Sequence, residues 1–201
     1  MGDKWTIKLQ WSDYIDEYYN PLEENDCVKL HHFNRDWIGT RSPDEWEAYV
    51  NEHGEVTSSD VGVRRKLDCQ TLIPLSCYQH GGAEFSLYGG GMRCRFDTAG
   101  FAGFLELDPK VFKFDDREEA AASILKCYND YLNGRIVEVV VTPPDEEEGD
   151  IFGHRYVSEL WDQYKGSKNH SEVISNYLYE WASEYVDLPP RDEVDIDRGD
   201  F

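Results

Sequence analysis

Residues 71–107 read TLIPLSCYQHGGAEFSLYGGGMRCRFDTAGFAGFLEL, and this stretch decides the fold. Short runs of apolar and β-branched residues alternate in it with glycine-rich turns, which is the pattern of a meander of antiparallel strands. The pattern begins at Leu67, so we place the meander at residues 67–107. Its predicted strands are 71–78, 84–88, 92–96 and 103–107, and its predicted turns are Gly81-Gly82, Gly89-Gly90-Gly91 and Gly100.

The segments around the meander supply further predicted elements. Apolar and polar residues alternate over residues 5–11, which predicts a strand with its large side chains on one face. Residues 115–133 open with acids that suit the positive end of a helix dipole, and their apolar residues recur at helical spacing. The other predicted elements are strands at 28–33 and 136–141, and helices at 43–53, 157–164 and 173–185.

Length and composition favour one α+β domain with an appendage. A chain of 201 residues with 40% hydrophobic content can bury a sizeable core. We expect an antiparallel sheet made from the N-terminal strand, the meander and the strand at 135–142, packed by the one long helix at 115–133. The predicted organisation is an α+β core domain at 1–144, an acidic loop at 145–150, a helical C-terminal appendage at 151–188 and a frayed acidic tail at 189–201.

The chain is strongly acidic, with 41 acidic residues against 20 basic ones and a net charge of −21 at pH 7. A chain this acidic repels nucleic acid and anionic membranes, so we expect neither as a direct partner and predict a partner protein with a basic surface. Residues 51–100 are nearly neutral, with 6 acids and 5 bases. There we expect Arg64–Lys66, Arg93 and Arg95 to pair with the chain's own acids, and a small-anion site is the alternative.

The chain has no pattern of a secretory signal at its start, and no apolar run approaches the roughly 20 residues that span a bilayer. A soluble cytoplasmic protein is therefore the expectation. The five cysteines include no C-x-x-C pair, which argues against a disulfide framework and a zinc knuckle. We predict reduced and mostly buried thiols.

One group of residues in the meander has the chemistry of a catalytic site. His80, Cys94 and Asp97 would form a Cys-His-Asp relay on neighbouring strands, because the base must bond the nucleophile and be oriented by an acceptor. No ligand pair in this group has the spacing that preorganises a metal site, so we predict no metal and no cofactor. The glycines at 89–91 lack the strand, turn and helix of a dinucleotide site. The pair His31-His32 lies in a predicted strand, where neighbouring side chains face opposite sides.

The same region contains an ordered set of motifs. The set is His80-Gly81-Gly82, then Cys94-Arg95-Phe96-Asp97-Thr98-Ala99-Gly100-Phe101-Ala102-Gly103-Phe104, and then Tyr128-Asn129-Asp130-Tyr131-Leu132-Asn133-Gly134. Over residues 70–141 it resembles a group of uncharacterised proteins encoded by bacteriophages and mobile elements, with one extra residue at the turn after Asp97. The resemblance implies no particular activity. It implies a context in which proteins of this size act on host machinery or on rival defences.

Charge and context together favour a non-catalytic binding protein whose acidic face engages a basic surface of a host or defence protein. The most specific form of this hypothesis is a DNA mimic that inhibits restriction or CRISPR enzymes, because spaced carboxylates compete for sites that read phosphates. Two alternatives stay open: an enzyme that uses His80, Cys94 and Asp97, and an acidic protein of a salt-adapted organism or its virus with a structural role. The predicted partner-binding residues are Asp145, Glu146, Glu147, Glu148, Asp150, Glu180, Glu184 and Asp187.

Overall fold

The computed structural model describes residues 4–13, 20–22, 26–32, 72–95, 97–113, 115–144, 146 and 149–199. The chain divides into two compact units. The terminal unit consists of residues 1–19 together with 134–201, and the central unit consists of residues 20–133. Each unit has a four-stranded sheet with at least one helix packed against it, so the predicted α+β class is confirmed.

Strands from the predicted meander form most of the sheet of the central unit, but they are not arranged as a meander, because β5 pairs with β3 and not with β4. The strands lie in the order β2-β5-β3-β4, and each neighbouring pair is antiparallel. Residues 92–95, predicted as part of a strand, belong instead to the loop between β4 and β5. There the carbonyl of Met92 and the amide of Cys94 bond to the side chain of Thr98, and the carbonyl of Cys94 accepts from the amide of Thr98 four residues later, as in a turn. The strands are β2 (Val28–His32), β3 (Leu72–Gln79), β4 (Ala83–Leu87) and β5 (Thr98–Leu107).

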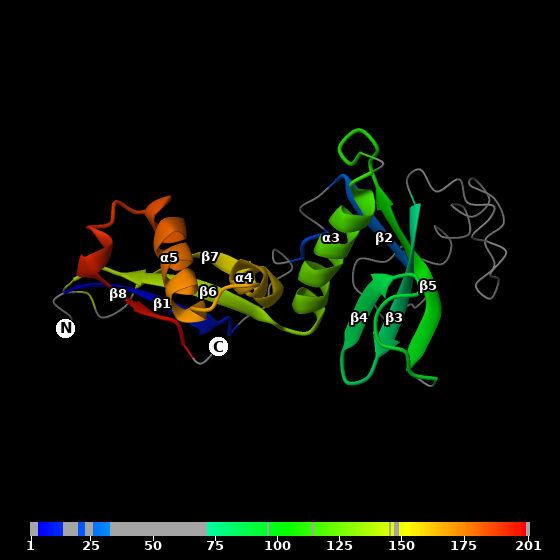
Figure 1. Cartoon of the computed structure of the whole chain (residues 1–201), viewed down its shortest axis with the longest axis horizontal. Coiled ribbons are helices and arrows are strands. Elements are labelled where there is room, and N and C mark those ends of the chain that lie inside the picture. The colour runs from blue at the N-terminus through cyan, green and yellow to red at the C-terminus, as the bar shows by residue number, and fades with distance from the viewer. Residues whose placement is uncertain are drawn as a thin grey trace. The chain divides into compact units, whose positions relative to one another are not determined.

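The predicted long helix is α3 (Arg117–Leu132), and it packs against β4 (Figure 1). Ala121, Leu125 and Tyr128 are buried, at the helical spacing that the sequence indicates. The centroid of the Tyr128 ring lies 5.9 Å from that of Phe85 in β4. The buried side chains of α3 therefore pack against β4, the edge strand of the central sheet, and form part of the core of this unit.

The terminal unit has a second sheet, in the order β7-β6-β1-β8. Its strands are β1 (Trp5–Trp11), β6 (Ile136–Thr142), β7 (Asp150–Tyr156) and β8 (Val194–Asp197). β1 runs antiparallel to β6 and parallel to β8. Two helices, α4 (Val157–Tyr164) and α5 (His170–Ser183), pack against this sheet, and the short 3-10 helix η2 (Arg191–Glu193) leads into β8. Buried side chains from both layers form the core, among them Ile7, Leu9, Val137, Val139, Leu160, Ile174, Leu178 and Trp181.

The prediction of a single sheet is wrong, because β1 and β6 pair with each other and not with the meander. Ile7 and Leu9 of β1 share a core with residues of α5, whereas the meander is covered by α3. Each sheet therefore has its own helical cover. The division into units differs from the predicted core domain at 1–144, since the first 19 residues group with the C-terminal part and the boundary lies at Gly134.

The C-terminal part contains more strand than we predicted. Helices form at 157–164, as predicted, and at 170–183, but the predicted helical appendage begins with β7. The tail at 189–201, predicted to fray, forms η2 and β8. Val194 is buried and Ile196 packs against the core, while Asp195 and Asp197 alternate with them and are exposed. This is a strand period within an acidic segment.

Some predictions concern residues outside the described part of the chain. These are the helix at 43–53, the basic cluster Arg64–Lys66 and the thiol of Cys69.

Candidate functional site

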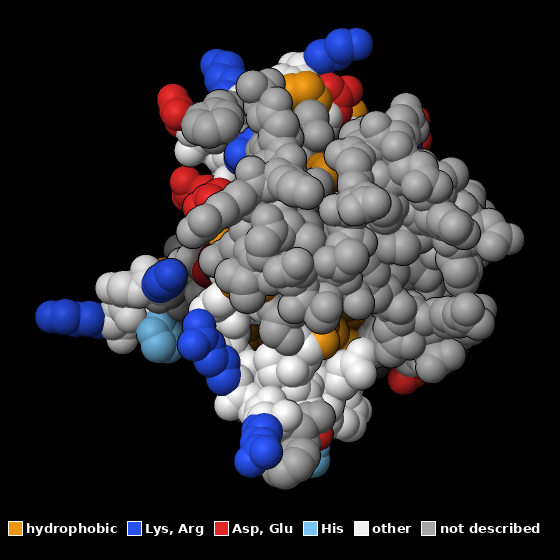
Figure 2. Space-filling model, turned by 90° about the vertical axis from the view of Figure 1, so that its right-hand side faces the viewer, with side chains coloured by type: hydrophobic (Ala, Val, Ile, Leu, Met, Phe, Trp, Pro, Cys, Tyr) orange, Lys and Arg blue, Asp and Glu red, His pale blue; other side chains and the backbone are white. Residues whose placement is uncertain are grey.

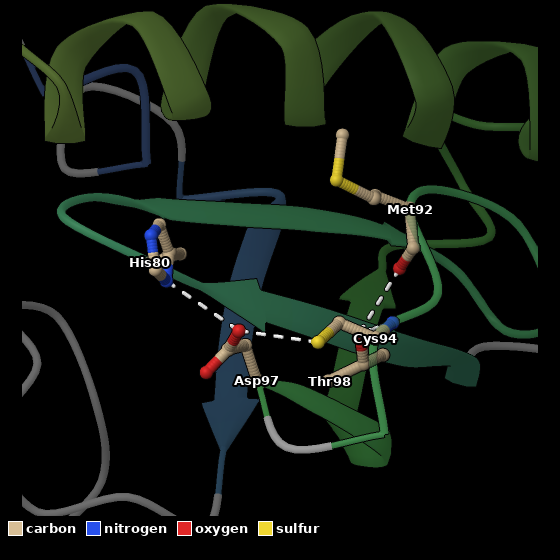
Figure 3. Close-up of polar contacts among 5 residues, drawn as sticks. All are labelled: His80, Met92, Cys94, Asp97 and Thr98. Carbon is tan, nitrogen blue, oxygen red and sulfur yellow. Dashed lines mark hydrogen bonds and ion pairs between the residues drawn. The ribbon is translucent and has the colours of Figure 1, made fainter.

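The structure brings His80, Cys94 and Asp97 together at one end of the central sheet (Figure 3). His80 directly follows β3, and Asp97 directly precedes β5. Because β3 and β5 are antiparallel, the end of one meets the start of the other, and the amide of Gln79 donates to the carbonyl oxygen of Asp97 at 2.7 Å. Cys94 lies three residues before Asp97 in the loop between β4 and β5.

The carboxylate of Asp97 stands between the other two side chains. Its Oδ2 atom accepts the thiol hydrogen of Cys94, with a sulfur-to-oxygen distance of 3.1 Å. The same oxygen lies 3.4 Å from Nδ1 of His80, whose side chain is 72% exposed. The ring of His80 also stacks on that of Tyr78, with centroids 6.4 Å apart.

This order of contacts differs from that of a Cys-His-Asp relay. In a relay the imidazole contacts the sulfur, and the carboxylate contacts the far side of the imidazole. Here the carboxylate contacts both, so the contacts do not place His80 where it would take the thiol proton of Cys94. The arrangement suits a structural brace better than a nucleophile and its base.

Thr98 is a member of this group that sequence reasoning missed. Its hydroxyl accepts from the amide of Cys94 at 2.8 Å and donates to the carbonyl of Met92 at 3.1 Å. Its own amide donates to the carbonyl of Cys94 at 3.1 Å. Three bonds therefore hold the backbone of residues 92–94 against the start of β5, as Figure 3 shows for the hydroxyl. Threonine bonds the nearby backbone in turns, which is the signal that could have identified it.

A cavity of about 400 Å³ opens beside this loop. It is lined by Ser76, Tyr88, Cys94, Thr98, two glycines, and both Arg93 and Arg95. The two arginines named for the small-anion alternative therefore lie together. Nη2 of Arg93 donates to the carbonyl oxygen of Gly89 at 2.6 Å.

The four cysteines in the described part of the chain are free thiols, and their burial differs from the prediction. Only Cys77 is buried; Cys27, Cys94 and Cys127 are half-buried. Burial raises the pKa of the Cys77 thiol from its ordinary value of 9.0 to about 11. Cys77 is therefore a protonated core residue at neutral pH and a poor nucleophile.

The predicted partner-binding acids belong to the terminal unit, and five of them are described. Glu146, Asp150, Glu180, Glu184 and Asp187 are all exposed. Glu180 lies on α5, Glu184 is its C-terminal cap residue, and Asp187 follows the helix. Asp145, Glu147 and Glu148 lie outside the described residues.

The acidic excess is greater in the terminal unit. Its 87 residues include 21 acids and 8 bases, a difference of −13. The 114 residues of the central unit include 20 acids and 12 bases, a difference of −8. On the face shown in Figure 2, the described Lys and Arg side chains stand at several separate points.

The described residues hold no group of three or more His, Cys, Asp or Glu side chains that could bind a metal ion. His31 of β2 is buried and lies opposite Phe104 of β5. Its Nε2 atom lies 2.6 Å from Oε2 of Glu106, which is two residues beyond Phe104 in β5. The histidine is thus held by the chain's own carboxylate. Within the described part of the chain, no helix has the length and apolar character needed to cross a membrane.

Comparison with known proteins adds no assignment. No protein-family model matches the chain, and the comparisons with curated proteins and with solved structures find no match either. The resemblance of residues 70–141 to proteins of mobile elements therefore stays a prediction.

Proposed function

We propose that the chain is a non-catalytic binding protein whose terminal unit engages a basic surface of a partner protein. The observation that carries this proposal is the outward side of α5. Glu172, Glu180 and Glu184 are exposed there, and α5 contains no lysine or arginine. The opposite side of the helix is buried in the core of the unit, so the helix presents these acids to solvent.

These acids are not neutralised by neighbouring side chains in the described part of the chain. No described lysine or arginine lies within ion-pair distance of Glu180, Glu184 or Asp187. By contrast, Asp195 on β8 pairs with Lys4, with a distance of 3.7 Å between Nζ and Oδ1. A like-charged pair four residues apart is slightly unfavourable for an isolated helix. Retaining Glu180 and Glu184 together is therefore consistent with a role in binding.

The spacing of the acids on α5 distinguishes general binding to a basic surface from mimicry of duplex DNA. Residues four apart on a helix are separated by about 6 Å along its axis. Duplex DNA presents one charge per roughly 1.7 Å of its axis. The acidic stripe of α5 is therefore sparser than DNA, and it supports binding to a basic protein surface more directly than it supports full mimicry of a duplex.

The enzyme alternative receives less support from the geometry. The carboxylate of Asp97 occupies the position between Cys94 and His80 that a relay requires the imidazole to occupy. The buried thiol of Cys77 has a raised pKa of about 11. We therefore favour binding over catalysis.

The test compares two double variants of the full chain with equal change in charge. E180Q/E184Q neutralises two acids of the proposed binding face, and E118Q/E119Q neutralises two acids in the first turn of α3 in the central unit. Each variant is immobilised, exposed to cell lysate at low and high salt, and then washed with duplex DNA. Circular dichroism checks that both variants keep their helices.

We expect the unmodified chain and E118Q/E119Q to retain the same basic proteins at low salt, and E180Q/E184Q to lose them. High salt should release these partners, because the attraction is between exposed charges. Release by DNA would identify the partner surface as a nucleic-acid-binding site and extend the proposal to mimicry. Equal retention by both variants would contradict the proposal.

A further inference from the structure

The cavity beside the loop from β4 to β5 has two basic residues in its lining, although the chain as a whole is acidic. Its described lining contains Arg93 and Arg95 and no aspartate or glutamate. A second cavity of the central unit, of about 250 Å³, shows the contrast, since Asp26, Glu106 and Asp108 line it with a single lysine, Lys29. The charged residues that line the first cavity are both arginines, and two basic groups at one cavity favour an anionic ligand.

The loop that carries the two arginines is held in place before any ligand binds. Thr98 bonds both Met92 and Cys94, and the thiol of Cys94 bonds Asp97 (Figure 3). Arg93 and Arg95 flank the braced Cys94 on either side. A site whose groups are already positioned loses less conformational freedom on binding.

A hydrogen bond to the backbone holds the side chain of Arg93, and its other N–H donors are available to a ligand. One of its terminal nitrogens donates to the carbonyl of Gly89, and both residues line the cavity. A guanidinium has five N–H donors, and no other described residue accepts from Arg93. Gly89 and Gly90 also line the cavity, where the lack of side chains lets a ligand approach the backbone.

From these observations we propose that the cavity binds a small organic molecule with a phosphate or carboxylate group. The guanidinium of Arg93 is suited to such a group, because its planar donors match two oxygens at once. The volume of about 400 Å³ exceeds that of an inorganic ion and lies in the range of small-molecule pockets. Tyr88 supplies an aromatic surface for the body of the ligand. This site lies in the central unit and is independent of the acidic face of α5.

The test follows the backbone amides of Gly89 and Gly90 in the full chain by ¹H–¹⁵N NMR during titration with four probes. Phenyl phosphate and benzoate carry the two anionic groups on a ring, inorganic phosphate is the anion alone, and benzyl alcohol is a neutral ring. We expect the first two to shift both amides in a saturable way, with the tighter of them identifying the preferred group. Inorganic phosphate should bind at least tenfold more weakly, and benzyl alcohol should have no effect.

Matched variants test the role of the arginines. R93Q should weaken binding of the tighter probe at least tenfold, because a charge-assisted bidentate contact is lost. R95Q is the second variant, since it leaves the bond between Arg93 and Gly89 in place, and it should weaken binding as well. K110Q removes one exposed positive charge of the same unit outside the cavity, and it should change affinity less than twofold.

Three results would overturn the proposal. They are the absence of amide shifts with both ring anions, equal affinity for inorganic phosphate and the ring anions, and equal weakening by R93Q and K110Q. Amide spectra outside the loop show whether each variant keeps its fold.

Discussion

The side chain of Asn129 forms two hydrogen bonds with the backbone of a single residue, Phe85. The amide of Phe85 donates to Oδ1 at 2.7 Å, and Nδ2 donates to the carbonyl of Phe85 at 2.9 Å. Asn133, one helical turn later, repeats this pattern with Ala83, at 3.1 and 2.8 Å. Asn129 and Asn133 are four residues apart, a rise of about 6 Å along a helix, and Ala83 and Phe85 are two residues apart, about 6.8 Å along a strand. The spacing of the two asparagines therefore matches that of the two strand residues. β4 is the edge strand of its sheet, and the two asparagine side chains bond its outer backbone amides and carbonyls as a neighbouring strand would.

Replacing Asn129 by alanine should destabilise the central unit by about 2–4 kcal/mol, because a backbone donor and acceptor of the buried residue Phe85 lose their partner. Asn176→Ala is the matched control, because Asn176 is an exposed asparagine of α5 whose side chain bonds no described residue. Both changes improve helix propensity equally. Urea unfolding followed by circular dichroism measures the difference. Similar stabilities for the two variants would show that the edge contact contributes little.

Gly91 and Gly81 test how tightly the site loop is packed. Both have φ of +72°, a conformation that costs roughly 1–2 kcal/mol for a residue with a side chain. A Cβ atom on Gly91 would lie 2.5 Å from Oγ of Ser86, whereas one on Gly81 meets nothing within 4 Å. We expect Gly91→Ala to destabilise the protein by about 1 kcal/mol more than Gly81→Ala, from the added steric strain. Equal free energies of unfolding would mean that Ser86 moves aside without cost.

The raised pKa of Cys77 predicts a loss of stability at alkaline pH. Near neutral pH the thiol is protonated in both folded and unfolded chains. Between about pH 9 and 11 the unfolded thiol ionises while the buried one keeps its proton, so rising pH favours the unfolded chain. The full difference of about two pKa units corresponds to roughly 3 kcal/mol.

Urea unfolding of wild type and Cys77→Ala at pH 8 and pH 10.5 checks this prediction. The alanine variant should start less stable, because it leaves a small cavity, and should lose less stability on going to pH 10.5. Parallel losses in both proteins would assign the alkaline effect to other groups.

Arg155 stabilises the terminal unit by lying over Trp181, with its Cζ atom 3.7 Å from the centre of the indole ring. Its Nε atom also donates to the hydroxyl of Tyr177 at 3.0 Å. Arg155→Lys should cost about 1–2 kcal/mol, because lysine cannot both stack on the ring and reach the hydroxyl. Arg191→Lys is a suitable comparison, since Arg191 lies 5.9 Å from the centre of the Tyr179 ring. Hydrogen exchange of β6 and β7 amides should increase more for Arg155→Lys, and the reverse order would contradict the assignment.

Local patterns identified many of the elements correctly. The alternation at Trp5–Trp11, the stripe from Ala121 to Tyr128 and the β-branched run at 136–141 each lie within one element. The period of such a pattern depends only on the geometry of that element. The sequence predicts a frayed tail where β8 forms, because the acids that alternate with Val194 and Ile196 are typical of a solvated segment, although the two apolar residues have the period of a strand.

The candidate sites show the same division between local and distant information. His80 and Asp97 lie together because β3 and β5 are antiparallel neighbours. The strand pattern predicts both strands but not that these two pair, because a meander would place each strand beside the next one in the chain. The position of the carboxylate between Cys94 and His80 depends on side-chain placement within an irregular loop. The contribution of Thr98 depends on the same loop.

The amino-acid sequence was enough to predict the α+β class, most strands of the central sheet, the long helix, the acidity and the residue types available at each site. The position of β1 between β6 and β8, which lie more than 100 residues away in the chain, and the division of the strands into two sheets come from tertiary packing. Periodicity shows which face of a strand is buried, but it does not say which of several similar strands will pair with it. That choice depends on which helix covers each apolar face, and it is made only when distant segments pack together.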